Sequence, residues 1–307
     1  MGSEPIVTTL SSRAVPDRPL TGSSLIACYW AVTKPEVNFL VLITTFAGFA
    51  LGSASEAQHI SLPRLFNALL GTLLVAGGTA ALNQYLERSF DAQMRRTARR
   101  PVAAGRIEPN SALIFGTALA VSGSIYLDLT SSPLASLLAL LTLLSYLFLY
   151  TPLKRRTPLC VFVGTFPGAM PPIIGWAAVS SHLNMEAWLL YATLLLWQFP
   201  HFMAIAWMYR EDYERAGYHM LPKGNATFAF VILQTILPLL ALIPIGIVQG
   251  PARHAAIFEC TGLVLGLGYL YFGLEFVFRR SRLAARRLLA ASIIYLPALC
   301  VLKAVLR

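Results

Sequence analysis

Three oxygen-bearing side chains recur every four residues at the end of a long apolar run: Asn83, Glu87 and Asp91. On an α-helix this spacing puts them on one slanting face. An amide and two carboxylates offer oxygen ligands, which suit a hard cation such as Mg²⁺. Four arginines follow directly: Arg95, Arg96, Arg99 and Arg100. Metal ligands beside guanidinium groups predict a diphosphate site. In a soluble protein the same pattern more often marks a solvated helix end, so the context decides.

Composition supplies that context. Hydrophobic residues make up 56% of the 307 residues and charged residues only 12%, about half the share of an ordinary soluble domain. Seven uncharged runs are each long enough to span a bilayer core of about 30 Å, and two further runs are shorter. The nine runs cover 37–55, 65–86, 109–127, 129–153, 157–185, 187–209, 224–252, 260–274 and 288–302.

These runs predict an all-α polytopic membrane protein, in which nine transmembrane helices surround a central cavity open to the cytoplasmic side. We expect residues 25–307 to form this single domain. Residues 1–24 are polar and rich in Ser, Thr and Pro, which predicts a disordered cytoplasmic tail. The four cysteines are isolated in apolar surroundings without metal-ligand spacing, which is typical of buried small hydrophobic residues.

Charge predicts the orientation. Most of the 24 Lys and Arg residues fall in the tail and in alternate loops. The positive-inside rule therefore puts the N-terminus and these basic loops in the cytoplasm and the C-terminus outside. The net charge of +10 reflects this topology, and we expect no nucleic acid as a partner. The absence of a targeting segment favours the plasma (inner) membrane of a bacterium.

Several elements must hold the site at the cytoplasmic side. Lys34 comes at the mouth of the first span, where it can reach either a lipid phosphate or a substrate phosphate. Lys154 and Arg155 lie in the basic loop after the fourth span. The segment 157–185 contains too many glycines and prolines for a regular helix, so we expect a broken helix that lines a central pocket.

A second acidic helix end follows the sixth span. His201, Tyr209 and Asp212 lie within about 80° of one another on a helical wheel, and Glu211 precedes Asp212. Two acidic helix ends on one side could clamp two metal ions on one diphosphate. A single histidine such as His201 is otherwise often a core residue with a satisfied hydrogen bond.

The same segments resemble the UbiA-type intramembrane prenyltransferases, and most closely the protoheme IX farnesyltransferase branch. The first match is N-x-x-x-E-x-x-x-D-x-x-M-x-R-T-x-x-R-P at 83–101. Others are VTKP at 32–35, GTFPGAMPPIIGW at 164–176 and WQFPHFMAIAW at 197–207. The chain departs from the pattern at Glu87, where many members carry Asp, and at Arg210-Glu211 before Asp212.

The resemblance implies an enzyme that transfers a farnesyl group from farnesyl diphosphate to a vinyl group of haem B, with addition of water, to give haem O. It implies Mg²⁺ as cofactor and, as metal ligands and catalytic residues, Asn83, Glu87, Asp91 and Asp212, with Tyr209 lining the pocket. The diphosphate would contact Lys34, Arg96, Arg100, Lys154 and Arg155. His201 would contact the porphyrin, through its ring or its iron. A groove open to membrane lipid would hold the farnesyl tail, and a haem A synthase is an expected partner.

Two alternatives stay open at this stage. The acceptor could be the aromatic ring of a quinone precursor. In another class, the chain could be a membrane transporter or haem carrier that uses the acidic helix end as an ion site. The hydropathy pattern does not show the repeated halves that would favour a transporter, and a transporter would not need the arginine run.

Overall fold

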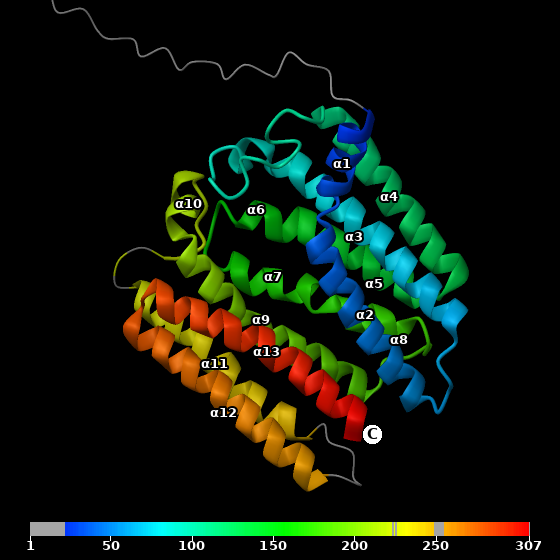
Figure 1. Ribbon diagram of the computed structural model, residues 1–307, viewed down its shortest axis with the longest axis vertical. Coiled ribbons are helices and arrows are strands. Elements are labelled where there is room, and N and C mark those ends of the chain that lie inside the picture. The colour runs from blue at the N-terminus through cyan, green and yellow to red at the C-terminus, as the bar shows by residue number, and fades with distance from the viewer. Residues whose placement is uncertain (1–21, 223, 225, 249–254, 307) are drawn as a thin grey trace, which may run out of the picture.

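The computed structural model describes residues 22–222, 224, 226–248 and 255–306, and this part of the chain contains helices and turns without strands (Figure 1). The first helices are α1 (Gly22–Val32), α2 (Pro35–Ser55), α3 (Leu62–Asp91), α4 (Pro109–Thr130) and α5 (Pro133–Leu144). A π-helical segment η1 (Ser145–Tyr150) leads into α6 (Thr151–Leu153), α7 (Cys160–Gly168), α8 (Met170–Ala177) and α9 (Met185–Met208). The last are α10 (Arg210–Arg215), α11 (Ala226–Val248), α12 (Ala255–Arg279) and α13 (Arg282–Leu306).

Within the described residues, nine helical segments are long and apolar enough to cross a membrane, which confirms the predicted all-α class and the nine predicted spans. The fourth runs through α5, η1 and α6, and the fifth joins α7 to α8. Of the predicted tail, residues 1–21 lie outside the described part of the chain, whereas α1 begins at Gly22.

Local sequence signals explain where the helices begin. Proline at the first position starts α2, α4 and α5, because its fixed φ suits a first helical turn that needs no N–H partner. The Ser132 side chain accepts a hydrogen bond from the Ala135 amide before α5, and Asn184 accepts one from Ala187 before α9. These caps satisfy amides that have no partner inside the helix.

The predicted break in the segment 157–185 is confirmed. The segment forms two short helices that meet at Ala169, with Pro167 just before the junction and Pro171 just after it. It is also the most buried of the nine candidate spans, because 72% of the residues in Cys160–Ala177 are buried. Its glycines allow close packing, because a methyl group on Gly175 would overlap the Thr45 carbonyl of α2. Whether it lines a central pocket stays a prediction.

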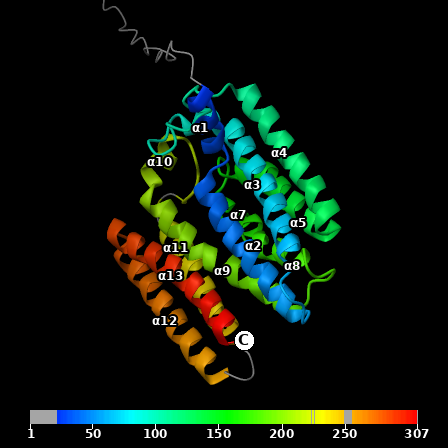
Figure 2. The same cartoon turned by 45° about the vertical axis from the view of Figure 1, so that its right-hand side comes forward.

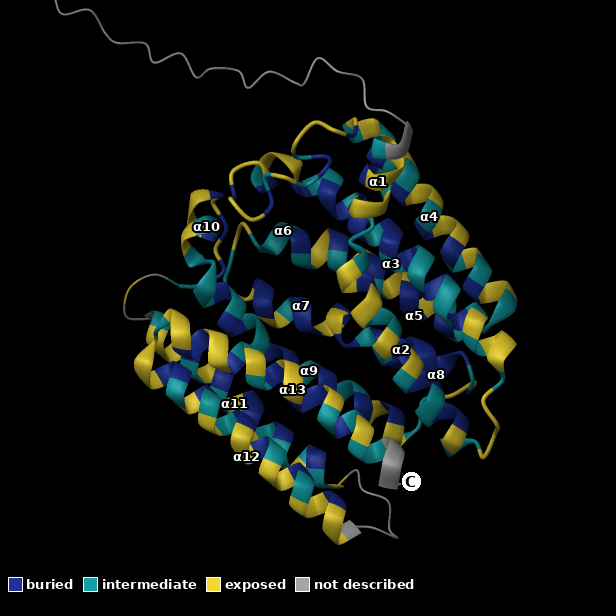
Figure 3. Ribbon diagram, viewed as in Figure 1, coloured by how far each residue is buried: buried dark blue, intermediate teal, exposed yellow. Residues whose placement is uncertain are grey.

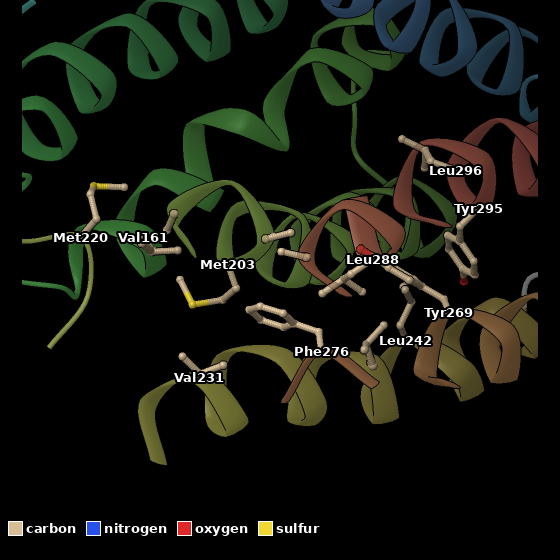
Figure 4. Close-up of a cluster of buried hydrophobic side chains, with 14 of the residues drawn as sticks. Val161, Met203, Met220, Val231, Leu242, Tyr269, Phe276, Leu288, Tyr295 and Leu296 are labelled. Atoms are coloured by element: carbon tan, nitrogen blue, oxygen red, sulfur yellow. The ribbon is translucent and has the colours of Figure 1, made fainter. Parts of the chain in front are cut away.

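The helices form two groups that lie side by side in both views (Figures 1 and 2). In one group α9, α11, α12 and α13 enclose a core that includes Met203, Phe276 and Leu288 (Figure 4). In the other, α2, α3, α4, α5 and α8 pack around a second core with the fully buried Trp176. The outward faces of α11, α12 and α13 expose large apolar side chains, as lipid-facing helices do (Figure 3).

The C-terminal end of α3 and the short helices α6 and α10 lie at the same end of the bundle as α1 (Figure 1). The chain segments that follow α3, α6 and α10 therefore meet there. They carry most of the residues that the sequence predicts for a diphosphate site.

Candidate active site

The last two turns of α3 bring the predicted oxygen ligands together in a buried position. Asn83 is 1% exposed, Glu87 3% and Asp91 1%. Asn83 Nδ2 donates to Glu87 Oε2 at 2.8 Å, as expected for side chains one turn apart on one face. Such polar groups are costly to bury unless they are paired, so their partners define the site.

Three of the predicted diphosphate-binding residues are those partners. Lys154 Nζ lies 3.0 Å from Glu87 Oε1, and its side chain is 12% exposed. Arg100 Nη1 lies 2.8 Å from both Asp91 carboxylate oxygens. The third partner binds the amide: Lys34 Nζ donates to Asn83 Oδ1 at 2.8 Å. Each of the three predicted metal ligands on α3 is thus neutralised or hydrogen-bonded by a basic side chain from another segment.

The corner between α1 and α2 holds Lys34 at the site. Lys34 has φ 54° and ψ 63°, a left-handed conformation that costs a non-glycine residue about 1–2 kcal/mol. Asn38 Nδ2 donates to the Thr33 carbonyl at 2.7 Å, and Gln84 Nε2 donates to the Val32 carbonyl at 3.1 Å. These hydrogen bonds tie the corner to α2 and to α3, which supports the strained backbone.

Lys154 is placed by the end of the fourth span. Its ammonium lies 4.5 Å from the centre of the Tyr150 ring, a cation–π distance. Its backbone carbonyl accepts a hydrogen bond from the His219 amide at 2.7 Å, which connects this loop to the segment after α10. The neighbouring residue, Tyr218, donates its hydroxyl to Glu87 Oε1 at 2.8 Å.

Tyr218 is a site residue that no sequence pattern indicates. It lies in an irregular segment, where no helical spacing relates it to Glu87. Burial and the adjacent Glu87 carboxylate raise the pKa of the Tyr218 hydroxyl above its ordinary value, so it stays a hydrogen-bond donor.

The two lysines at the site, Lys34 and Lys154, differ in the directions of their pKa shifts. Burial, followed by the Arg100 charge, lowers the pKa of Lys34 to about 7. Burial also opposes the charge on Lys154, yet the adjacent Glu87 raises its pKa well above the ordinary lysine value. Lys154 is therefore held as a cation, while Lys34 is the more readily neutralised of the two.

Arg96 and Tyr209 also come together. The Arg96 guanidinium lies 4.9 Å from the Tyr209 ring centre, and its Nη2 donates to the Tyr213 hydroxyl at 3.0 Å. Arg155 stacks on Phe90, next to Asp91 in sequence, at 4.2 Å. Both arginines are thus fixed by aromatic rings.

Asp212 pairs within its own helix, with Arg215 at 3.0 Å. In the part of the chain that the structure describes, no three His, Cys, Asp or Glu side chains gather to hold a metal ion. The set on α3 combines two carboxylates, Glu87 and Asp91, with the amide of Asn83. Metal binding by Asp212 across two acidic helix ends stays a prediction.

His201 lies away from the α3 cluster, between α9 and α13. Its Nδ1 is 2.8 Å from Ser292 Oγ, and its ring stacks on Trp197 with centroids 4.9 Å apart. A hollow of about 410 Å³ opens beside α10, and no predicted site residue lines it. Its walls are Trp207, Arg210, Glu214, Leu221, Pro222, Gly224 and Thr227.

The donor set on α3 fits a hard divalent cation. It presents one amide oxygen and two carboxylates from adjacent helical turns, all buried beside basic side chains. The same surroundings suit an anion that binds together with a metal ion, because the basic side chains around the α3 ligands can contact the oxygens of the anion.

Comparison with known proteins places this geometry in a family context. The model of the UbiA prenyltransferase family matches residues 41–295. A Solibacter usitatus protein named protoheme IX farnesyltransferase is 44% identical over 276 residues, covering 88% of this chain and 94% of that protein. A Koribacter versatilis protein of the same name is 40% identical over 289 residues, covering 90% and 92%.

Solved structures share the fold. A digeranylgeranylglyceryl phosphate synthase superposes with a TM-score of 0.72 at 16% identity, over 92% of this chain and 98% of that one. A UbiA homolog from Archaeoglobus fulgidus bound to GPP and Mg²⁺ gives 0.63 at 12% identity, over 90% and 99%. Together with the nine apolar helices, these comparisons indicate an integral membrane protein.

Proposed function

Because this chain belongs to the UbiA prenyltransferase family, we propose that it transfers a farnesyl group from farnesyl diphosphate to a vinyl group of haem B, with addition of water and release of diphosphate, giving haem O. Relatives named protoheme IX farnesyltransferase match about nine-tenths of the chain at 40–44% identity, which supports this acceptor over a quinone precursor. A family of prenyltransferases also favours an enzyme over the transporter or haem carrier.

One observation supports the reaction most directly: two buried carboxylates and a buried amide lie beside partly buried basic groups at one end of the bundle. Asn83, Glu87 and Asp91 would hold Mg²⁺, which would neutralise charge that develops on the departing diphosphate. The Archaeoglobus homolog, bound to GPP and Mg²⁺, supports this cofactor.

The basic residues would bind the diphosphate oxygens. Lys34, Lys154 and Arg100 are close enough to the α3 ligands to exchange those carboxylate and amide oxygens for phosphate oxygens. Arg96 and Arg155 would extend the set. Because the phosphate oxygens carry more negative charge in the transition state, prealigned cations stabilise it more than the ground state.

Other residues would protect the reaction and the acceptor. The allylic cation left by the diphosphate must be shielded from early capture by water, and the apolar walls of the bundle can exclude water. Tyr218 holds the Glu87 carboxylate in place. Tyr209 would line the pocket, Asp212 would add a second acidic group, and His201 would contact the porphyrin.

The setting of the reaction follows from the charge pattern. The basic loops favour a cytoplasmic site, where farnesyl diphosphate and Mg²⁺ are present, with the N-terminus inside and the C-terminus outside. A bacterial inner membrane suits this topology. A haem A synthase would be a partner that consumes the product, and membrane lipid would surround the farnesyl tail.

Mass analysis of the porphyrin tests this proposal. Purified protein incubated with haem B, farnesyl diphosphate and Mg²⁺ should convert haem B to haem O, and Asp91→Ala should abolish the conversion. Asp128→Ala removes an acidic side chain at an exposed position of α4; it is the matched control and should retain activity. Farnesylation of an aromatic quinone precursor instead of haem B would overturn the assignment of the acceptor.

A further inference from the structure

His201 on α9 and Ser292 on α13 form a partly buried polar contact between the two helices. His201 Nδ1 lies 2.8 Å from Ser292 Oγ. The Trp197 indole donates to the Ser292 backbone carbonyl at 2.8 Å, and its ring stacks on His201. Ser292 is 0% exposed. One residue of α13 therefore anchors two neighbouring aromatic side chains of α9.

The hydroxyl proton of Ser292 is already engaged. Ser292 Oγ donates to the Leu289 carbonyl at 2.6 Å within α13. A hydroxyl has a single proton, so towards His201 this oxygen can act only as an acceptor. With the Ser292 hydroxyl directed at the Leu289 carbonyl, His201 Nδ1 carries the proton and donates it. In the neutral imidazole the other nitrogen, Nε2, is then left with its lone pair.

The other ring nitrogen of His201 is left without a partner within the described part of the chain. Among the described residues, Nε2 of His201 has no hydrogen-bond partner, and this atom is not fully buried. His201 as a whole is only partly buried. An imidazole that donates through Nδ1 to a fixed acceptor and leaves Nε2 without a partner has the arrangement of a metal-ligating histidine.

We propose that Ser292 fixes His201 in the Nδ1–H form, so that Nε2 binds the iron of the haem acceptor as an axial ligand. This inference rests on the proposed function, which supplies haem B as substrate. Ser292 is a positioning residue, because it acts on the iron only through His201. The Nε2 lone pair forms one coordinate bond, and no proton or electron has to move when the haem binds.

The position along α9 is compatible with a porphyrin that reaches the diphosphate end. His201 precedes Tyr209 by eight residues, about 12 Å along a helix. Tyr209 contacts Arg96, which belongs to the diphosphate-binding set.

The protonation pattern can be tested without haem. In ¹⁵N-histidine-labelled protein in detergent, the His201 signals, assigned by their loss in His201→Gln, should show a protonated Nδ1 and an unprotonated Nε2. In Ser292→Ala this preference should weaken or reverse. The Trp197 hydrogen bond to the backbone of residue 292 remains possible in that variant, so the helix contact is kept. A protonated Nε2 in the unaltered protein would overturn the proposal.

Titration with ferric haem B tests the coordinate bond. The absorption and electron paramagnetic resonance spectra should show an axial histidine, and His201→Gly should lose this signature and regain it with added imidazole. Ser292→Ala should bind haem about 10- to 100-fold more weakly. Ser292→Thr, which keeps the hydroxyl, should bind haem as the unaltered protein does. His59→Ala, at an exposed loop position, is the histidine control.

The two proposals fail in different ways. In one outcome, His201→Gly binds haem with the spectrum of the unaltered protein, and the unaltered protein forms haem O. Iron ligation by His201 is then wrong and the farnesyl transfer stands. If haem binds with the histidine signature but is never farnesylated, the ligation stands and the proposed reaction is wrong.

Discussion

The Nη1 atom of Arg100 lies 2.8 Å from both carboxylate oxygens of Asp91. Lys154 pairs with Glu87 at 3.0 Å in the same cluster. Both carboxylates that would hold Mg²⁺ are therefore neutralised by side chains that would bind diphosphate. A metal ion that binds alone has to displace buried cations and leave them without partners, which is costly. A diphosphate supplies those partners.

We therefore expect the binding of Mg²⁺ and the binding of diphosphate to strengthen each other. In calorimetry on the purified protein, each should raise the affinity of the other by about tenfold or more, a coupling of about 1.4 kcal/mol. Arg100→Gln should bind Mg²⁺ alone more tightly and diphosphate more weakly. Arg99→Gln, at an exposed position of the same loop, is the control. Equal Mg²⁺ affinity with and without diphosphate would contradict this expectation.

Glu87→Gln should destabilise the fold more than Asp91→Asn. Loss of the Glu87 charge leaves the Lys154 ammonium, whose side chain is 12% exposed, without its counterion, whereas the Arg100 side chain is 26% exposed and can reach water. Breaking a buried pair in this way costs about 3–5 kcal/mol. Thermal unfolding in detergent measures the difference.

The double variant Glu87→Gln/Lys154→Met serves as the control for that comparison. Because it removes both members of the pair, it should unfold at a higher temperature than Glu87→Gln alone. A double variant that is no more stable than Glu87→Gln alone would show that the unpaired Lys154 charge is not the cause.

Gly48→Ala should loosen the contact between α2 and α8. A methyl group at this position would overlap the Pro172 carbonyl, and backbone atoms cannot move aside as a flexible side chain can. Overpacking of this kind costs about 1–3 kcal/mol. Gly268→Ala, in α12, meets nothing within 4 Å and should leave the unfolding temperature unchanged or raise it. Equal effects of the two changes would contradict the close packing.

The sequence predicted the α3 cluster well because helical spacing alone brings Asn83, Glu87 and Asp91 to one face. It could not assign their partners, since the contacts of Lys154 and Tyr218 with Glu87 join segments 67 and 131 residues apart in the chain. Tyr218 lies in a segment without periodicity. Such a residue is recognised only when the tertiary structure brings it to the site.

Two further features were also outside the reach of pattern analysis. Ser292 is one small polar residue in an apolar run, and its role depends on the way α13 packs against α9. The left-handed backbone of Lys34 depends on hydrogen bonds from Asn38 and Gln84 to the preceding residues. The Gly- and Pro-rich break before α8, in contrast, was predicted, because these residues restrict the backbone wherever they occur.

Substitutions of Lys34 can separate the effect of backbone strain on stability from the effect of the amine on farnesyl transfer. Lys34→Gly and Lys34→Ala both remove the amine that donates to Asn83, so both should lose most farnesyl transfer. At φ 54° only glycine is unstrained, so Lys34→Gly should be more stable than Lys34→Ala by about 1 kcal/mol. Ala57, at φ 51° in an exposed loop, is the matched control, and Ala57→Gly should gain similar stability with activity unchanged. Thermal unfolding and porphyrin mass analysis on the same preparations check both effects. If Lys34→Gly retained full farnesyl transfer, the amine would have no part in diphosphate binding.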